Sequence, residues 1–399
     1  MGVDAVGTGL FLPVSVLYPM RVLGLSEAVT GTVLTIATCL TLALPALVSV
    51  WIGRVGPRRL VVAGLLLQAV AMTAYLCAGG PLSVFAVVLC AVTGQRVFFA
   101  SVYGMLADLA PSGSRDGYFA WAATMQSGGT ALGGLLSGAL FIGGDPSSYR
   151  LAVGGDGLTF ALSALLVLLF VRAPEPVPGN AEGTGTALAR VLADRPFLGL
   201  TAANTLLVLP IPATSTLLPA FVVGHLGAPA WLPGALTGGA TALLTVCRPA
   251  AVRALARINR VRVLQTVAAL LAVWAAAMGA AVLMATASVV PYLFAVTGLF
   301  GLAFLVQGPV SNGLVAAVAP EPHRSGYLAV SQYSFGVADA AAPLLVVLLT
   351  LSTWLPWAVL TCCMVVALAV LTAVSRSWPR RLLCPADPAP DADRVLVSG

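Results

Sequence analysis

The sequence contains two related copies of one long segment. The stretch LADLAPSGSRDGYFAWAATMQSGGTALGGLL, which begins at Leu106, returns about 209 residues later as VAAVAPEPHRSGYLAVSQYSFGVADAAAPLL. A second similarity, shifted by about 200 residues, pairs Ser15 with Ser215 and Gly24 with Gly224. The repeat predicts a chain made of two pseudo-symmetric halves, with a site between them.

The composition places both halves in a lipid bilayer. The chain is 59% hydrophobic and only 9% charged, and its mean hydropathy is +0.99 over 399 residues. Apolar runs of about 20 residues are long enough to cross the hydrocarbon core as helices. We count twelve such runs, at 3–24, 28–52, 60–80, 82–108, 116–142, 151–172, 197–222, 231–253, 263–286, 289–317, 326–350 and 354–375. The expected fold is an all-α membrane protein of two six-helix bundles.

The arginines predict the orientation. All 20 basic residues are arginine, and if the loops alternate between the two faces, nearly all of these residues share one side. Only Arg21 and Arg150 fall on the other side, and Arg96 lies inside a run. The positive-inside rule then puts both termini in the cytoplasm. The absence of lysine suggests a GC-rich bacterial genome, so we expect a bacterial plasma membrane, and the net charge of +6 does not indicate nucleic-acid binding.

The predicted organisation has four parts. These are an N-terminal bundle at 1–172, a Pro/Gly-rich cytoplasmic linker at 173–195, a C-terminal bundle at 196–376 and a cytoplasmic tail at 377–399. In the repeat, Asp4 aligns with Asn204, about two turns inside the seventh run. We therefore expect a short basic leader to precede Met1 in the native product.

Catalytic and metal-binding patterns are missing from the sequence. The seven cysteines show no paired metal-ligand spacing, and His225 and His323 both fall in predicted loops. There is no phosphate-binding Gly/Lys loop and no HExxH motif. We expect no enzyme activity, no cofactor and no metal. The expected partners are the lipid bilayer, a small-molecule substrate and protons, and we expect a monomer.

Several motifs resemble the major facilitator superfamily over essentially the whole chain. The segment GRVGPRRL, at 53–60, is similar to the family's basic loop between helices two and three, although Gly53 stands where the family has an acid. The resemblance implies that loop arginines fasten the cytoplasmic helix ends as the transporter changes conformation. These are Arg54, Arg58 and Arg59, with Arg115 and Arg324 in the later loops. Positive-inside anchoring explains the same arginines equally well.

Two further motifs resemble drug/proton antiporters of that family. GQRVFFA, at 94–100, places Arg96 near mid-membrane, where a lone guanidinium costs at least about 2.5 kcal/mol without a partner or a wet cavity. The resemblance implies a role in proton coupling, whereas clamping by backbone carbonyls would be purely structural. The fifth run resembles the antiporter glycine motif through Gly129, Gly133, Gly134 and Gly138. Close helix packing is the alternative explanation for these glycines.

Proton coupling requires a group that changes charge inside the membrane. Asp339, near the middle of the eleventh run, is the first candidate, and Asp4 is the second. Asp156 is predicted to lie within about two turns of the outer surface and to hydrogen-bond locally. Proline hinges are expected at Pro13, Pro19, Pro212 and Pro219.

Polar residues inside the runs are the candidate substrate-binding residues, although they also satisfy backbone groups elsewhere in membrane proteins. They are Tyr103, Trp121, Gln126, Asn204, Gln307, Asn312, Gln332 and Tyr333. So few charges favour a largely apolar or amphipathic solute. We therefore expect a secondary active transporter that works by alternating access and exports its solute in exchange for protons. The alternatives are an importer working as symporter or facilitator, and a transport-inactive receptor or assembly partner.

Overall fold

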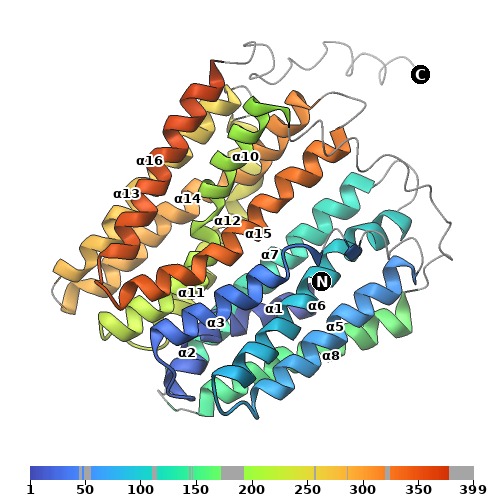
Figure 1. Ribbon diagram of the computed structural model, residues 1–399, viewed down its shortest axis with the longest axis vertical. Helices are drawn as coiled ribbons and strands as arrows, with labels where there is room; N and C mark the ends of the chain where they lie inside the picture. Colours follow the sequence, from blue (N-terminus) through green and yellow to red (C-terminus); the bar gives the residue numbers. More distant parts are fainter. Residues whose placement is uncertain are drawn as a thin grey trace.

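The computed structural model is helical throughout the part of the chain that it describes (Figure 1). The described residues are 1–44, 47–48, 55–109, 115–142, 145, 147–171, 193–255, 258–284, 286–319 and 324–376. Most of the predicted linker and the whole predicted tail lie outside these ranges. Each of the twelve apolar runs corresponds to one helix or to one group of consecutive helices.

The helices follow the two halves of the sequence. The first half contains α1 (Gly2–Phe11), α2 (Val14–Arg21), α3 (Glu27–Leu40), α5 (Pro57–Tyr75), α6 (Pro81–Leu109), α7 (Arg115–Leu140) and α8 (Ser147–Phe170). The second half contains α10 (Arg195–Val208), α11 (Pro210–Pro219), η1 (Ala220–His225), α12 (Leu232–Leu255), α13 (Arg260–Ala280), η2 (Ala281–Leu283), α14 (Thr286–Val318), α15 (Arg324–Leu349) and α16 (Leu355–Ser375).

Length and hydropathy qualify most of these helices as membrane spans. Within the described residues, 8 helices or continuous helical stretches are long and apolar enough to cross a membrane, and α1 with α2 makes a ninth if this bent pair is one span. Helix α3 falls short only in its described length. The remaining two predicted runs form α7 and α12, which have 26 and 24 residues. The model is consistent with twelve spans.

Local sequence explains where several helices begin and break. Asp194 caps α10, because its Oδ1 accepts a hydrogen bond from the Phe197 N–H at 3.1 Å. Asn259 caps α13 in the same way through Val261 and Arg262. Helices α1 and α2 meet at a 43° bend next to Pro13, which lacks a backbone N–H. The hinge predicted at Pro13 is therefore present.

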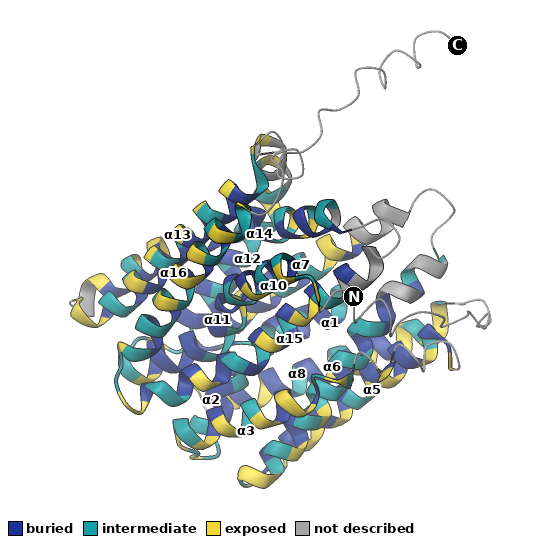
Figure 2. Ribbon diagram, turned by 45° about the horizontal axis from the view of Figure 1, so that its top comes forward, coloured by how far each residue is buried: buried dark blue, intermediate teal, exposed yellow. Residues whose placement is uncertain are grey.

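Buried residues, dark blue in Figure 2, occur along helices of both halves. Their apolar side chains form two clusters that follow the repeat. One cluster comes mainly from the first half and includes Leu65, Tyr75 and Phe160. The other comes mainly from the second half and includes Trp274, Leu360 and Met364. The packing is also repeated: α1 contacts α7 and α8 as α10 contacts α15 and α16, and α5 contacts α6 and α8 as α13 contacts α14 and α16.

The two halves meet through three helix pairs, α3 with α15, α7 with α12 and α2 with α11. Two glycines bring the first two pairs close together: Gly31 of α3 lies against Pro343 of α15, and Gly134 of α7 lies against Gly238 of α12. Because successive spans run in opposite directions, these contacts lie toward the end of the molecule that carries α2, α11 and η1. We call this the closed end.

Candidate functional site

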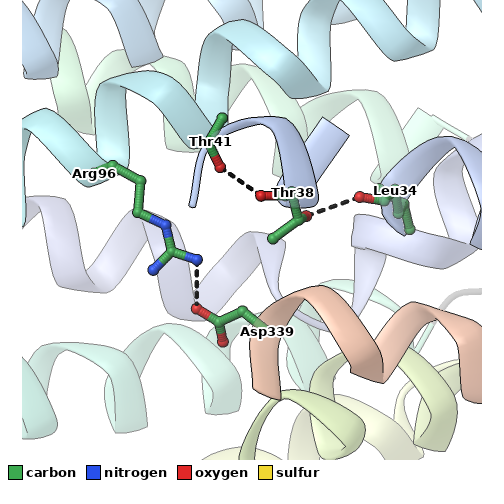
Figure 3. Close-up of polar contacts among 5 residues, drawn as sticks. All are labelled: Leu34, Thr38, Thr41, Arg96 and Asp339. Carbon is green, nitrogen blue, oxygen red and sulfur yellow. Dashed lines mark hydrogen bonds and ion pairs between the residues drawn. The ribbon is translucent and has the colours of Figure 1, made fainter. Parts of the chain in front are cut away.

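A charge pair joins the two halves near the middle of the helices. The Arg96 guanidinium of α6 donates through Nη2 to Asp339 Oδ2 of α15 at 3.1 Å (Figure 3). The two residues are 243 positions apart in the sequence. The Asp339 side chain keeps 40% of its surface accessible, against 15% for Arg96. The carboxylate is therefore partly accessible while it neutralises a mostly buried guanidinium.

Backbone positions around the pair leave room for the arginine. Gly336 lies one turn before Asp339 on α15. A Cβ on Gly336 would lie 3.1 Å from Leu42 Cδ2 and 3.9 Å from Arg96 Nη1. Leu42, which follows α3, and Arg96 of α6 therefore both lie next to Gly336 of α15. Arg96 Nε is buried without a hydrogen-bond partner among the described residues, so Asp339 is the charged group that holds this side chain.

The pair breaks the pseudo-symmetry of the chain. In the repeat of about 209 residues, Arg96 corresponds to Leu305 and Asp339 corresponds to Thr130. The symmetry-related location therefore has no ionisable group at either position. Changing the charge of the Asp339 carboxyl therefore acts on one of the two halves' contacts and leaves the equivalent position in the repeat unaffected.

Polar contacts fasten the closed end. His225 Nε2, at the end of η1, lies 2.8 Å from Glu27 Oε1 at the start of α3. Arg21 donates to the Val223 carbonyl oxygen at 3.3 Å, and Ser15 Oγ donates to the Ser215 carbonyl oxygen at 3.4 Å. The sequence analysis did not identify this set. The repeat could have suggested these contacts, because Gly24 aligns with Gly224, and Glu27 and His225 lie close to these two equivalent positions.

The glycines of α7 serve two different contacts. A Cβ on Gly129 would lie 2.6 Å from the Gly2 carbonyl oxygen, and Gly133 packs equally closely on Val6 and Gly9, so both face α1. Gly134 and Gly138 face α12, where Gly234 and Gly238 are the matching small residues. Small residues on both sides let backbones approach closely. The motif thus places α7 between its own half and the other half.

Three of the predicted cavity residues are located in or beside a buried hydrogen-bond network. Asn204 Oδ1 accepts from Gln307 Nε2 at 3.0 Å and from Ser311 Oγ at 2.7 Å. Asn204 and Gln307 are buried, at 5% and 2% exposure, whereas Asn312, one residue beyond Ser311, is exposed. The network joins α10 to α14 inside the second half. Two donors thus satisfy the Asn204 Oδ1 acceptor in this conformation.

The other predicted cavity residues are spread over two surfaces. Trp121 is exposed and, with Met125, lines a cavity of about 830 Å³ between α1, α6, α7 and α8. Gln126 is half-buried one residue further along α7. Gln332 and Tyr333 are exposed on α15, about two turns before Asp339. The Tyr103 side chain lies outside the described part of the structure.

The loop arginines are only partly described. Arg58 donates to the Leu168 carbonyl oxygen near the end of α8 at 2.8 Å, and so satisfies an end-of-helix acceptor. Arg59 is exposed. Arg54 and the side chains of Arg115 and Arg324 lie outside the described residues. The described residues contain no group of three His, Cys, Asp or Glu residues that could hold a metal ion.

Two similar helix bundles with an ionic contact between them define the class of membrane transporters that work with two pseudo-symmetric halves. The comparisons agree. The sequence model of one protein family, the Major Facilitator Superfamily, matches residues 1–282, so the chain belongs to this family. No protein of curated function matches at the sequence level.

Solved structures of the same fold are transporters. A mutant of the nucleoside transporter NupG matches with a TM-score of 0.78 at 12% identity, covering 94% of this chain and 97% of that chain. An auto-inhibited POT family peptide transporter matches with a TM-score of 0.75 at 13% identity, covering 97% of both chains. A peptide transporter POT bound to sulfate gives 0.71 at 17% identity, covering 94% and 93%. At these identities the likeness establishes the fold.

Proposed function

We propose that the protein is a proton-coupled transporter that exports a small apolar or amphipathic compound by alternating access. The observation that carries the proposal is the contact between Arg96 and Asp339, 3.1 Å long and placed between the two halves. Protonation of Asp339 would remove the negative charge that holds Arg96. A proton would thereby weaken the contact between α6 and α15 and favour a different arrangement of the halves.

The conformation supports a switching mechanism. The closed end is held by the Glu27 contact with His225 and by the glycine contacts of α7 with α12. If both termini are cytoplasmic, as the positive-inside rule predicts, this conformation is closed toward the outside. Asp339 would then take up or release its proton on the cytoplasmic side in this state. Its 40% accessible side-chain surface is consistent with such exchange.

The chemistry of the helices favours an apolar or amphipathic substrate. Charged groups within the described spans are few, and two of the predicted polar cavity residues, Asn204 and Gln307, are engaged with each other. Dense polar recognition of a sugar or a polyanion would need more free donors and acceptors. Import of a nucleoside or peptide is the second candidate, and it is favoured by the transporters that share the fold.

Purified protein in proteoliposomes tests this function. A pH gradient is imposed, and a panel of radiolabelled apolar and amphipathic compounds is followed together with one nucleoside and one dipeptide. Proton movement opposite to an apolar compound supports the proposal, whereas movement in the same direction as the nucleoside or dipeptide supports import. Asp339→Asn and Arg96→Ala should each reduce proton-driven transport at least about 10-fold, which corresponds to about 1.4 kcal/mol.

Asp145→Asn is the matched control for that experiment. Asp145 is an exposed carboxylate next to α8. It accepts a hydrogen bond from the Ser147 backbone N–H at 2.9 Å, and this bond lowers its pKa, so the group stays ionised at neutral pH. Its substitution should leave transport unchanged. Unimpaired proton-driven transport in Asp339→Asn would overturn the coupling assignment.

A further inference from the structure

Asp156 is a buried carboxyl group that the proposed transport mechanism does not use. It lies near the middle of α8, about 14 Å from the start of that helix at Ser147, and only 1% of its surface is exposed. Its Oδ1 is buried and has no hydrogen-bond partner among the described residues. The sequence predicts a local hydrogen bond for Asp156, but its Oδ1 makes none among the described residues.

The Asp156 carboxyl points toward α1. A Cβ on Gly7 of α1 would lie only 2.7 Å from Asp156 Oδ1, so the missing side chain of this glycine makes room for the carboxyl. Asp4 lies one turn before Gly7, on the same face of α1, and is itself 7% exposed. If both carboxyl groups were ionised, their like charges would repel each other. Two carboxyl groups therefore share one buried helix interface.

Cations near this interface are already engaged elsewhere. Helix α8 packs against α1, α2 and α5. From α5, Arg58 bonds the Leu168 carbonyl near the other end of α8, and Arg59 is exposed. From α2, Arg21 bonds Val223, and the Tyr18 hydroxyl donates to the Tyr75 carbonyl oxygen. The remaining tyrosine hydroxyl on these elements, that of Tyr75, is buried and uncharged at neutral pH.

On α1, the amino group of Met1 lies 2.8 Å from Asp4 Oδ1. It faces Asp4 and is not paired with Asp156. Among the described residues, Asp156 makes no ion pair. Burying an ionised carboxylate without a partner costs so much that such a group takes up a proton instead. A second carboxylate close by adds to this cost.

We propose that Asp4 and Asp156 together hold one exchangeable proton inside the N-terminal half, at a site separate from Asp339. The ligand is the proton itself, held by the buried carboxyl groups at the α1 and α8 interface. The use of this proton in transport rests on the proposed function, but its binding does not.

A polar route connects the site to the cavity. Asp156, Thr159 and Ser163 follow one another at spacings of three and four residues, so they lie on one face of α8. The Thr159 hydroxyl donates to the Asp156 carbonyl oxygen at 2.8 Å, and both residues border Gly7. Ser163 lines the cavity of about 830 Å³, and its buried Oγ has no partner among the described residues. The hydroxyls offer a path for proton exchange between the cavity and the carboxyl pair.

Infrared spectroscopy of the purified full-length protein in lipid tests the site, because a protonated carboxyl group has its own carbonyl band. The wild type should show this band at neutral pH, and Asp156→Asn should remove it. The control Asp145→Asn should leave the band unchanged, since that carboxylate is ionised. An Asp156→Asn spectrum that superimposes on the wild type at every pH would overturn the proposal.

Two further variants keep the test decisive if Asp156→Asn fails to fold. Asp4→Asn should shift the titration of the band, because the repulsive partner is gone, and an unchanged titration would rule out a shared proton. Ser163→Ala should slow hydrogen–deuterium exchange of the band several-fold, and an unchanged exchange rate would rule out the route. Asp339→Asn should leave the Asp156 band in place, so failure of the coupling proposal and failure of this one are distinguishable.

Discussion

At the scale of single residues, the central observation is a charge that is stable in the membrane only because of one partner. Arg96 is 15% exposed in its side chain, and its contact with Asp339 Oδ2 supplies the negative charge that it needs. Removing either partner leaves the other charge without compensation, which is more costly than losing both. The repeat shows what an uncharged version of the site looks like, because Leu305 and Thr130 stand at the equivalent positions.

We predict strong energetic coupling between these two residues. Arg96→Leu and Asp339→Thr alone should each lower the free energy of unfolding by about 1–3 kcal/mol, because each leaves a charged group unpaired. The double variant should cost clearly less than the sum of the two. Thermal unfolding of the four proteins in detergent measures the cycle, and strictly additive effects would show that the contact contributes nothing to stability.

A second prediction concerns the closed end. Glu27→Gln removes the carboxylate that His225 Nε2 contacts, and a partly buried contact of this kind is worth about 0.2–1 kcal/mol. The ratio of closed to open molecules should therefore fall by up to about 5-fold. Reaction of a single cysteine placed at Ser215, in the closed interface, with a water-soluble maleimide reports the open fraction.

The control for this prediction is Thr350→Val, because the Thr350 hydroxyl near the same end bonds only within its own helix. This substitution should leave the reaction rate unchanged. Equal rates in Glu27→Gln and wild type would mean that the pair does not hold the end closed.

The sequence predicted the charged residues individually but not as a pair. Arg96 and Asp339 stood out because ionisable groups in an apolar helix are expensive. Their contact could not be predicted, because 243 residues separate them and the packing of α6 on α15 depends on how the two halves dock. Asn204 and Gln307 show the opposite limit, since polarity alone does not distinguish a residue free in a cavity from one satisfied by a neighbour.

At the scale of helices, α7 shows how residues without side chains decide which helices meet. Gly129 and Gly133 face α1, and Gly134 and Gly138 face α12, so one glycine-rich helix packs closely on two partners. The spacing of the glycines predicted close approach, as small residues in membrane helices do. It did not identify the partners, because the same spacing fits any helix with a matching small residue. The Gly234 and Gly238 pair provides this match in α12.

Gly134→Ala should destabilise the contact between α7 and α12. The added Cβ would lie 2.8 Å from Gly238 Cα, which is a backbone atom that cannot rotate away. Overpacking of this kind costs about 1–3 kcal/mol, so the melting temperature should fall by several degrees. Gly128→Ala on the same helix is the control, because nothing lies within 4 Å of its Cβ position. Equal melting temperatures for the two variants would show that the contact between Gly134 and Gly238 is not tight.

At the scale of the whole molecule, the repeat predicted most of the architecture. Two clusters of buried side chains, equivalent helix contacts in both halves and a helix or helix group for each apolar run all follow from a duplicated sequence. The repeat did not predict which end is closed. If the protein works by alternating access, as proposed, one sequence encodes at least two arrangements of the halves, and the choice between them depends on small differences among contacts such as Glu27 with His225 and Arg96 with Asp339.

The central claim is that protonation of Asp339 changes the arrangement of the two halves. Spin-label distances across both ends test it directly, using pairs at Leu82 and Leu351 for the closed end and at Phe170 and Ala373 for the other, in a background without native cysteines. These four positions are exposed. Acidification should lengthen the first distance and shorten the second, and Asp339→Asn should show the acidic distribution at every pH. Identical distributions in both proteins across the pH range would contradict the claim.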